Sequence, residues 1–371
     1  MAVTKPLLFS PIKIGSTALK HRVVMAPLTR FRADPKTFVP SEIAIDYYDQ
    51  RTSDGGLLIS EATFIAEEAG GMNGVPGIWS PEQVTGWKKI TSAVHAKGGR
   101  IFLQLWALGR VANPKIVQPV WGTTSKPYLV GSLAQPSAQN STPLTPMTAA
   151  DIERFVGHYR RAAVNAIEAG FDGVEIHGAN GYFIQSVSNE RTDEYGGSLE
   201  NRFRFPIRVV NEVCAAIGAD KVAIRMSPFN NYQGMREPDP LATFIPWAKT
   251  LVAAQPHLAY IHAVEARGAG VSGSDAASDK ASPDDKLDDI RHIVQGAGIP
   301  FVVCGGYTPE TAVAEAEKNG DIVAFGRQFI SNPDLPARIE NGWQLSKYDR
   351  PTFYAGGAKG YIDYPLYASR L

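Results

Sequence analysis

The segment DGVEIHGANGY, residues 172–182, carries the clearest local signal of the fold. Its apolar and β-branched first half predicts a short buried strand. The strand runs into His177 and then into a glycine-containing turn that carries Asn180 and Tyr182. Parallel strands followed by helices present their functional side chains at this end. The stretch therefore predicts one unit of a parallel α/β fold, with polar groups at the carboxyl end of its strand.

The same alternation of strand and helix runs through the rest of the chain. Short apolar runs predict eight strands, at 22–26, 57–62, 100–105, 173–176, 222–226, 258–262, 301–304 and 322–325. Parallel strands joined by helices need right-handed crossovers, and eight such units close a barrel. Short apolar segments around Gly15 also predict a hairpin over 8–21. The predicted fold class is α/β, a (β/α)8 TIM barrel with an N-terminal hairpin.

The helices are predicted from the spacing of apolar residues. Over 151–170 these residues recur every three or four positions and give one buried face, and 81–97 and 199–217 show the same pattern. Thr148 and Asp151 predict an N-terminal cap for the first of these helices. Pro206 lies inside the last pattern and predicts a kink or a late start there.

Two stretches are too long for ordinary connections between a strand and a helix. Residues 107–147 follow the third strand and are rich in proline, serine and threonine, which predicts a lid or small subdomain. Residues 265–283 are small and polar and predict a loop. Both follow strands, so both should lie on the face where the strands end.

The composition is that of an ordinary globular protein with balanced charge. Among 371 residues, 37 are Lys or Arg and 37 are Asp or Glu, and this balance argues against nucleic acid or an anionic membrane as a partner. Cys214 and Cys304 lack the spacing of a disulfide framework or metal site. No run reaches the about 18 apolar residues that span a bilayer. We expect a single cytoplasmic domain over 1–371, monomeric or homodimeric, that acts on small molecules.

Polar and glycine residues gather where the predicted strands end. Gly305 and Gly306 follow the seventh strand, and Gly326 and Arg327 follow the eighth. Glycines let backbone N–H groups approach an anion, and this end of such barrels often binds phosphate. Either pair alone could simply make a tight turn, but both together favour a phosphate. The groups at other strand ends suit the ring of flavin mononucleotide (FMN), namely Thr29, Gln104 and Arg225.

His177, Asn180 and Tyr182 offer two neutral hydrogen-bond donors and a phenol within six residues. Such a set can hold a carbonyl oxygen and supply a proton. A single histidine at a strand end is more often a satisfied structural residue, and a nearby tyrosine can simply pack. The residues alone therefore leave both interpretations open.

Several stretches, taken in chain order, closely resemble the old yellow enzyme family of flavin-dependent ene-reductases. They are MAPLTRFRA (25–33), QLWALGR (104–110), GFDGVEIHGANGY (170–182), RTDEYGGSLENRFRF (191–205), and FGRQFISNPDLPARI (325–339) with TFY (352–354). The resemblance covers nearly the whole chain. After Tyr182 the chain departs from the family pattern, because the segment that follows is shorter.

The resemblance implies the cofactor and the roles of the site residues. The implied FMN contacts are Pro27, Thr29, Ala62, Gln104, Arg225, Gly305, Gly306, Gly326, Arg327 and Phe353. It also implies that His177 and Asn180 bind the activating oxygen of the substrate and that Tyr182 is the proton donor. Trp106 and Tyr354 resemble residues that line the substrate pocket.

The implied function is FMN-dependent reduction of the C=C bond of α,β-unsaturated carbonyl compounds. NADPH, or NADH as the alternative, would supply the hydride in a ping-pong cycle. A second hypothesis is that the chain is a dedicated biosynthetic reductase or isomerase, of fungal type, that acts on one unsaturated aldehyde. The retained Tyr182 favours reduction over isomerisation. A third hypothesis, from a different functional class, is that the chain is a flavin-free barrel that serves as a binding protein.

Overall fold

The computed structural model describes residues 5–122, 144–183, 191–230, 232–266 and 282–367. Its main sheet is parallel, with the strand order β4-β3-β13-β12-β11-β10-β9-β6-β5, in which β5 is the short strand Thr63–Phe64. A further pairing of β4 with β6 closes the other eight strands into a barrel. The eight are β3 Val23–Met25, β4 Leu57–Ile59, β6 Arg100–Trp106, β9 Gly173–His177, β10 Val222–Met226, β11 Tyr260–Val264, β12 Phe301–Cys304 and β13 Ile322–Phe325. The predicted (β/α)8 barrel is confirmed.

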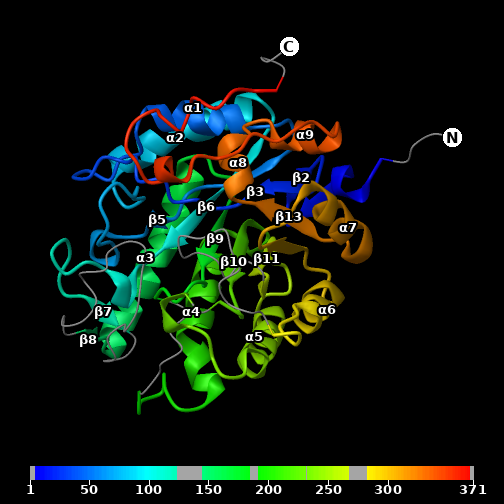
Figure 1. The fold of residues 1–371 in the computed structure, drawn as a ribbon. Helices are drawn as coiled ribbons and strands as arrows, with labels where there is room; N and C mark the ends of the chain where they lie inside the picture. Colours follow the sequence, from blue (N-terminus) through cyan, green and yellow to red (C-terminus); the bar gives the residue numbers. More distant parts are fainter. Residues whose placement is uncertain (1–4, 123–143, 184–190, 231, 267–281, 368–371) are drawn as a thin grey trace.

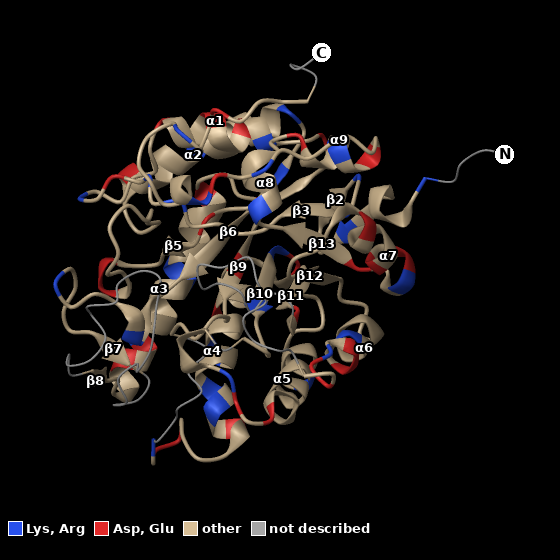
Figure 2. Cartoon of the chain, viewed as in Figure 1, with Lys and Arg blue, Asp and Glu red and all other residues tan. Residues whose placement is uncertain are grey.

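Helices surround the barrel, as Figure 1 shows. They are α1 Ile43–Arg51, α2 Pro81–Ala96, α3 Ala149–Glu168, α4 Leu199–Ile217, α5 Pro240–Ala254, α6 Asp288–Gly296, α7 Pro309–Asn319, α8 Arg327–Ser331 and α9 Leu335–Glu340. The predicted cap of α3 is confirmed, since Thr148 and Asp151 form a reciprocal capping box. Basic and acidic positions are mixed along the outer helices, in keeping with the balanced charge (Figure 2).

Several sequence-based boundaries differ from the structure by a few residues, and two of them are instructive. Helix α4 begins at Leu199 and continues through Pro206, so the alternative of a late start is wrong. Strand β11 begins at Tyr260, two residues after the predicted start at Leu258. Leu258 is buried among the outer core residues, but parallel pairing with β10 begins only where Tyr260 meets Ala223. Apolar residues report burial, whereas strand assignment depends on backbone pairing.

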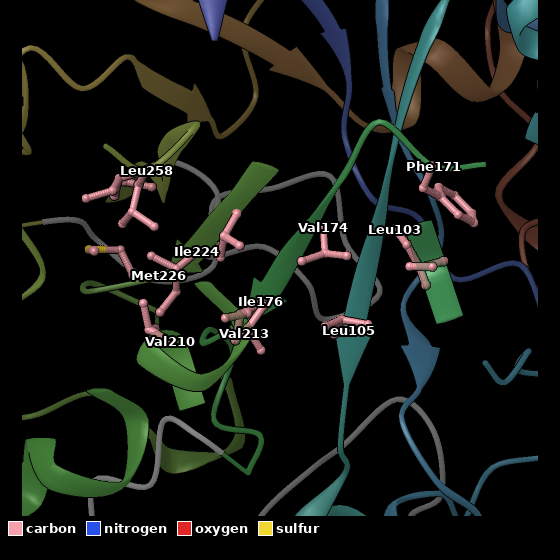
Figure 3. Packing of buried hydrophobic residues seen from close by; sticks show 14 of the residues in the cluster. Leu103, Leu105, Phe171, Val174, Ile176, Val210, Val213, Ile224, Met226 and Leu258 are labelled. Carbon is pink, nitrogen blue, oxygen red and sulfur yellow. The ribbon is translucent and has the colours of Figure 1, made fainter. Parts of the chain in front are cut away.

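The strands are buried on both faces, because the barrel has an inner and an outer core. Side chains alternate along each strand. Figure 3 shows the outward-pointing set, which packs against the helices and includes Leu103, Leu105, Val174, Ile176, Ile224 and Met226. The inward-pointing set fills the barrel with Val24, Leu57, Phe102, Tyr260, Val302 and Ile322. This double burial explains why the strands are short apolar runs.

The predicted N-terminal hairpin is confirmed and closes one end of the barrel. It consists of β1 Ile12–Ile14 paired antiparallel with β2 Thr17–Leu19, and Ile14 and Leu19 belong to the inner core. Gly15 lies against Asp220, at the amino end of β10. The hairpin therefore closes the end opposite the functional side chains, and only the carboxyl ends of the strands are left to build a site.

The two long connections are described only in part. From the predicted subdomain at 107–147, the structure describes a short turn of helix at Gly109–Val111 and two short paired strands, β7 Trp121–Gly122 and β8 Thr145–Pro146. Residues 123–143 and most of the predicted 265–283 loop lie outside the described residues, so both expectations stay predictions. Within the part of the chain that the structure describes, no helix is long and apolar enough to cross a membrane.

Candidate active site

Three aromatic rings lie against one another at the carboxyl ends of β6 and β9. The His177 ring stacks on Trp106 with the centroids 5.9 Å apart. Tyr182 stands edge-on to both rings, at 5.2 Å from His177 and 4.8 Å from Trp106. His177 and Trp106 are buried, whereas Tyr182 is half-buried. The structure thus brings together three of the residues that the sequence placed on the substrate side, and Asn180 lies on the same turn.

His177 is a neutral hydrogen-bond donor in this arrangement. Burial, and then the positive charge of Arg225 on the neighbouring strand, lower its pKa to about 3. The ring is therefore uncharged at neutral pH. The backbone N–H of Ala179 donates to Nδ1 of His177 at 3.3 Å, so Nδ1 is the nitrogen without a proton. The proton then sits on Nε2, which can donate to a ligand.

Tyr182 keeps its proton at neutral pH. Burial, followed by the neighbouring Tyr232, raises the pKa of its phenol well above the ordinary value. A phenol in this state is a hydrogen-bond donor and a weak acid rather than a base. The residues that follow, 184–190, lie outside the described part of the chain, and with them the shortened segment noted in the sequence.

A chain of buried polar side chains lies deeper in the barrel. Gln104, Glu175 and His262 come from β6, β9 and β11, and all three are buried. Nε2 of Gln104 donates to a Glu175 carboxylate oxygen at 2.7 Å, and Nδ1 of His262 lies 2.9 Å from the other oxygen. An ionised carboxylate only accepts, so the Gln104 amide must turn its NH2 group toward Glu175. Its oxygen is left as an acceptor for a ligand.

Arg225 and Cys304 complete this buried layer. Nη2 of Arg225 donates to the Cys304 sulfur at 3.3 Å. Burial by itself would raise the pKa of Cys304, but Arg225 and His262 outweigh it and lower the pKa to about 7. Burial likewise opposes ionisation of Glu175, yet the charge of His262 holds the pKa of that carboxyl below its ordinary value. The sequence assigned Cys304 to neither a disulfide nor a metal site, and the structure shows its sulfur as the acceptor of a charged group.

Glycines follow β12 and β13 at the carboxyl ends of the strands, the end of the barrel that is called the barrel mouth below. Gly305 has φ +142°, and a Cβ there would lie 2.7 Å from Cβ of Glu265, so the position requires glycine. Gly306 has φ +81° and open space where a side chain would be. Gly326 precedes Arg327, whose guanidinium lies 5.8 Å from the Tyr348 ring centroid. Backbone N–H groups at such glycines can approach an anion closely.

The remaining predicted cofactor residues lie around this mouth. Pro27 and Thr29 are half-buried beyond the end of β3, and Ala62 is buried beyond the end of β4. Phe353 is buried, whereas Tyr354 is 49% exposed and packs its ring 5.4 Å from Phe31. The last two come from a segment near the carboxyl end of the chain, which must be held against the barrel.

Two arginines that the sequence did not single out hold this segment in place. Arg30 donates to the carbonyls of Phe353 and Gly360. Arg32 donates to the carbonyls of Thr352, Phe353, Gly357 and Lys359. Both lie in the stretch MAPLTRFRA, directly after β3, and both are buried. Their position beside a strand end was the only signal in the sequence, and it could not reveal which carbonyls they bind.

We predict that Arg32→Lys loosens the segment that carries Phe353 and Tyr354. A lysine keeps the charge but lacks the planar fork of donors, so several of these carbonyls lose their partner. The free energy of unfolding should fall by about 2–4 kcal/mol. Denaturant unfolding and limited proteolysis near the carboxyl end test this. Arg161→Lys at an exposed position of α3 is the control. Equal rates of proteolysis for both variants would show that Arg32 does not hold this segment in place.

The groups at the mouth fit a planar cofactor that carries a phosphate. Among the described residues, Nε of Arg225 is buried without a hydrogen-bond partner, which suits a guanidinium that faces an anionic or polar ring. The Gln104 amide oxygen adds an acceptor, and Gly305 and Gly306 add backbone donors. A closed parallel barrel with such a mouth and a pair of neutral donors beside it defines the class of flavin-binding oxidoreductase barrels.

Comparison with known proteins then identifies the family. The model of the NADH:flavin oxidoreductase / NADH oxidase family matches residues 7–346. The chain therefore belongs to this family, the family of the old yellow enzymes, and it is an FMN-dependent oxidoreductase of the ene-reductase type. The resemblance seen in the sequence is confirmed.

The similarity to individual relatives extends over almost the whole chain. The chanoclavine-I aldehyde reductase of Penicillium roqueforti is 44% identical over 371 residues, which cover 97% of this chain and 96% of that protein. The NADP-dependent oxidoreductase lnbE of Aspergillus flavus is 43% identical over 372 residues, with coverage of 97% and 96%. The solved structure of an old yellow enzyme homologue from Zymomonas mobilis superposes with a TM-score of 0.86 at 40% identity, covering 97% and 99%.

Proposed function

We propose that this chain takes hydride from NADPH and reduces the C=C bond of α,β-unsaturated aldehydes and ketones. The observation that carries the proposal is the state of His177, a neutral ring with its proton on Nε2, packed against Tyr182 at the barrel mouth. Similarity to an NADP-dependent relative supports NADPH as the reductant. NADH is the alternative.

The residues at the mouth would hold FMN through its ring and its phosphate. Gln104 and Arg225 would bind the ring, and Gly305, Gly306, Gly326 and Arg327 the phosphate. The surrounding wall would come from Pro27, Thr29, Ala62 and Phe353. The chemistry that FMN supplies when bound is hydride transfer, first from the nicotinamide and then to the substrate.

His177 and Asn180 would act on the carbonyl oxygen of the substrate. Negative charge grows on this oxygen as the C=C bond takes up hydride, and donors fixed in advance bind the charged oxygen more strongly than the neutral one. Each such donor contributes on the order of 3–4 kcal/mol to the transition state. Because His177 is neutral, its Nε2–H acts as a donor without bringing a second positive charge beside Arg225.

Tyr182 would supply the proton to the α-carbon of the substrate. Its phenol is protonated at neutral pH, and its edge-on packing against His177 and Trp106 fixes the direction of the ring. Trp106 and Tyr354 would form the walls that select the substrate. The reduced product is complete once this proton is transferred, and the phenolate of Tyr182 then regains a proton from solvent.

A second candidate is a dedicated biosynthetic reductase for one unsaturated aldehyde. The similarity to the aldehyde reductases of Penicillium roqueforti and Cladobotryum favours it, since both names specify an aldehyde as the substrate. This candidate uses the same residues and differs only in the range of substrates.

The test is the visible spectrum of the purified protein under anaerobic conditions. We expect a flavin band that bleaches with NADPH and returns when 2-cyclohexenone is added. Return with one unsaturated aldehyde only, across a panel of enones and enals, would favour the dedicated reductase. A band that bleaches but returns with no member of the panel would overturn both candidates. A protein that neither contained flavin nor took up added FMN would likewise overturn both candidates.

A further inference from the structure

We propose that Asn230 is a positioning residue that fixes the side-chain amide of Asn180 with its NH2 group toward the substrate. The inference rests on the proposed role of Asn180 as a donor to the substrate oxygen. An asparagine amide has a donor end and an acceptor end that are almost identical in shape. Something other than shape must therefore decide which end faces the site.

The first step is the orientation of Asn230 itself. This side chain is buried, with 3% of its surface exposed, in the loop after β10. The backbone N–H of Tyr232 donates to Oδ1 of Asn230 at 2.8 Å. A backbone N–H can only donate, so the atom it meets must be the amide oxygen. The NH2 group of Asn230 is then forced to the other side.

The second step carries this orientation to Asn180. Nδ2 of Asn230 donates to Oδ1 of Asn180 at 3.1 Å. The oxygen of the Asn180 amide is thereby held by the loop, and its NH2 group is turned away from Asn230. No other side-chain hydrogen bond of Asn180 occurs within the described residues. The donor end of Asn180 is left for a ligand.

The backbone of Asn180 is held by the same loop. It has φ +60°, a left-handed conformation that asparagine tolerates better than most residues. Its N–H donates to Oγ of the buried Ser227 at 2.7 Å. Ser227 thus fixes where the Asn180 backbone lies, and Asn230 fixes which way its amide faces. The two contacts therefore have different roles, one in placing the backbone of Asn180 and the other in directing its side-chain amide.

Asn230→Asp is the most direct test, because it keeps the shape of the side chain and replaces its NH2 donor by an oxygen acceptor. Aspartate still accepts from the Tyr232 N–H but cannot donate to Oδ1 of Asn180. It would accept from Nδ2 instead, so the Asn180 amide would flip and present its oxygen to the substrate. Asn230→Ala removes the constraint without reversing it. We expect Asn230→Asp to weaken binding of 2-cyclohexenone to the oxidised holoenzyme about tenfold, and Asn230→Ala by less.

A double-mutant cycle with Asn180→Ala separates a positioning role from a structural one. We expect Asn230→Asp to change the dissociation constant of 2-cyclohexenone less than twofold when Asn180 is already alanine. The ligand is uncharged, so the new carboxylate does not repel it directly. KM and kcat for NADPH-driven reduction are measured alongside, with Asn211→Asp on the exposed face of α4 as the matched control. If the Asn230→Asp variant does not retain FMN, the same double-mutant cycle with Asn180→Ala is measured with Asn230→Ala and Asn230→Ser.

The outcomes distinguish this inference from the proposed function. If Asn180→Ala leaves ligand binding unchanged, Asn180 is not the donor and the proposed function fails at this residue. If Asn180→Ala weakens binding and the Asn230 variants do not, the positioning role is overturned while the proposed function stands. An equal effect of Asn230→Asp in both backgrounds would also overturn it, because the residue would then act independently of Asn180.

Discussion

Replacing His177 and Asn180 together by alanine is expected to lower kcat for 2-cyclohexenone by at least about 10³-fold. Removing a single donor of this kind typically costs about 10²–10³ in kcat, and paired donors are not strictly additive. The physical reason is that the charge on the substrate oxygen is then left without a fixed partner. Stopped-flow measurement of flavin reoxidation isolates this step from reduction by NADPH.

The same variant should keep its cofactor, because neither residue belongs to the proposed FMN contacts. Flavin content and the rate of reduction by NADPH are measured with the reoxidation rate. His257→Ala, at an exposed position, is the matched histidine control. Loss of FMN from the double variant would show that the pair holds the cofactor rather than the substrate, and normal reoxidation would show that it has no role in either.

Glu175→Ala is expected to lower the free energy of unfolding by about 3–5 kcal/mol, the cost typical of breaking a buried ion pair from one side. Glu175 accepts from Gln104 and faces His262, and its charge acts on Arg225. Without the carboxylate, His262 can lose its proton, but Arg225 cannot and remains charged inside the barrel. The Gln104 amide also becomes free to turn. We therefore expect weaker retention of FMN as well.

Urea unfolding of the variant and the wild type, at matched flavin content, measures the first effect. Glu42→Ala is the control, because Glu42 is exposed in its pair with Lys89 and its loss should cost less than about 1 kcal/mol of stability.

The effect of Glu175 on stability should depend on pH. The pKa of Glu175 is lowered in the folded state, so its contribution to the free energy of unfolding is fully present above about pH 4.5. The contribution is lost as the pH falls through the folded-state pKa. The difference between the proteins should shrink at low pH. A difference that does not change with pH would contradict the charge argument.

The sequence predicted most of the barrel, because periodicity and strand–helix alternation are local properties. The cap at Thr148 and Asp151 and the hairpin around Gly15 are likewise decided by neighbours in the chain. Exact element boundaries were harder to predict. Helix α4 begins at Leu199, so the late start at Pro206 is wrong. Strand β11 starts where β10, which is distant in the sequence, offers a pairing partner rather than where the apolar residues begin.

The candidate site shows the same division. Motifs placed His177, Asn180, Tyr182, Gln104 and Arg225 at strand ends, because strand ends can be found from the sequence alone. The partners that set their states come from elsewhere in the chain. Glu175 orients Gln104 from the next strand, and Asn230 reaches Asn180 from a loop that lies 50 residues further along.

Periodicity and motifs in the sequence were enough to predict the barrel, its N-terminal hairpin and the chemical types of the groups at the strand ends. The protonation state of His177, and the ends of the Gln104 and Asn180 amides that face a ligand, could be found only from the folded chain. The physical reason is that composition and spacing fix which groups are present, whereas burial, neighbouring charge and hydrogen-bond direction fix their state. Those three properties come into being only when distant strands and loops meet.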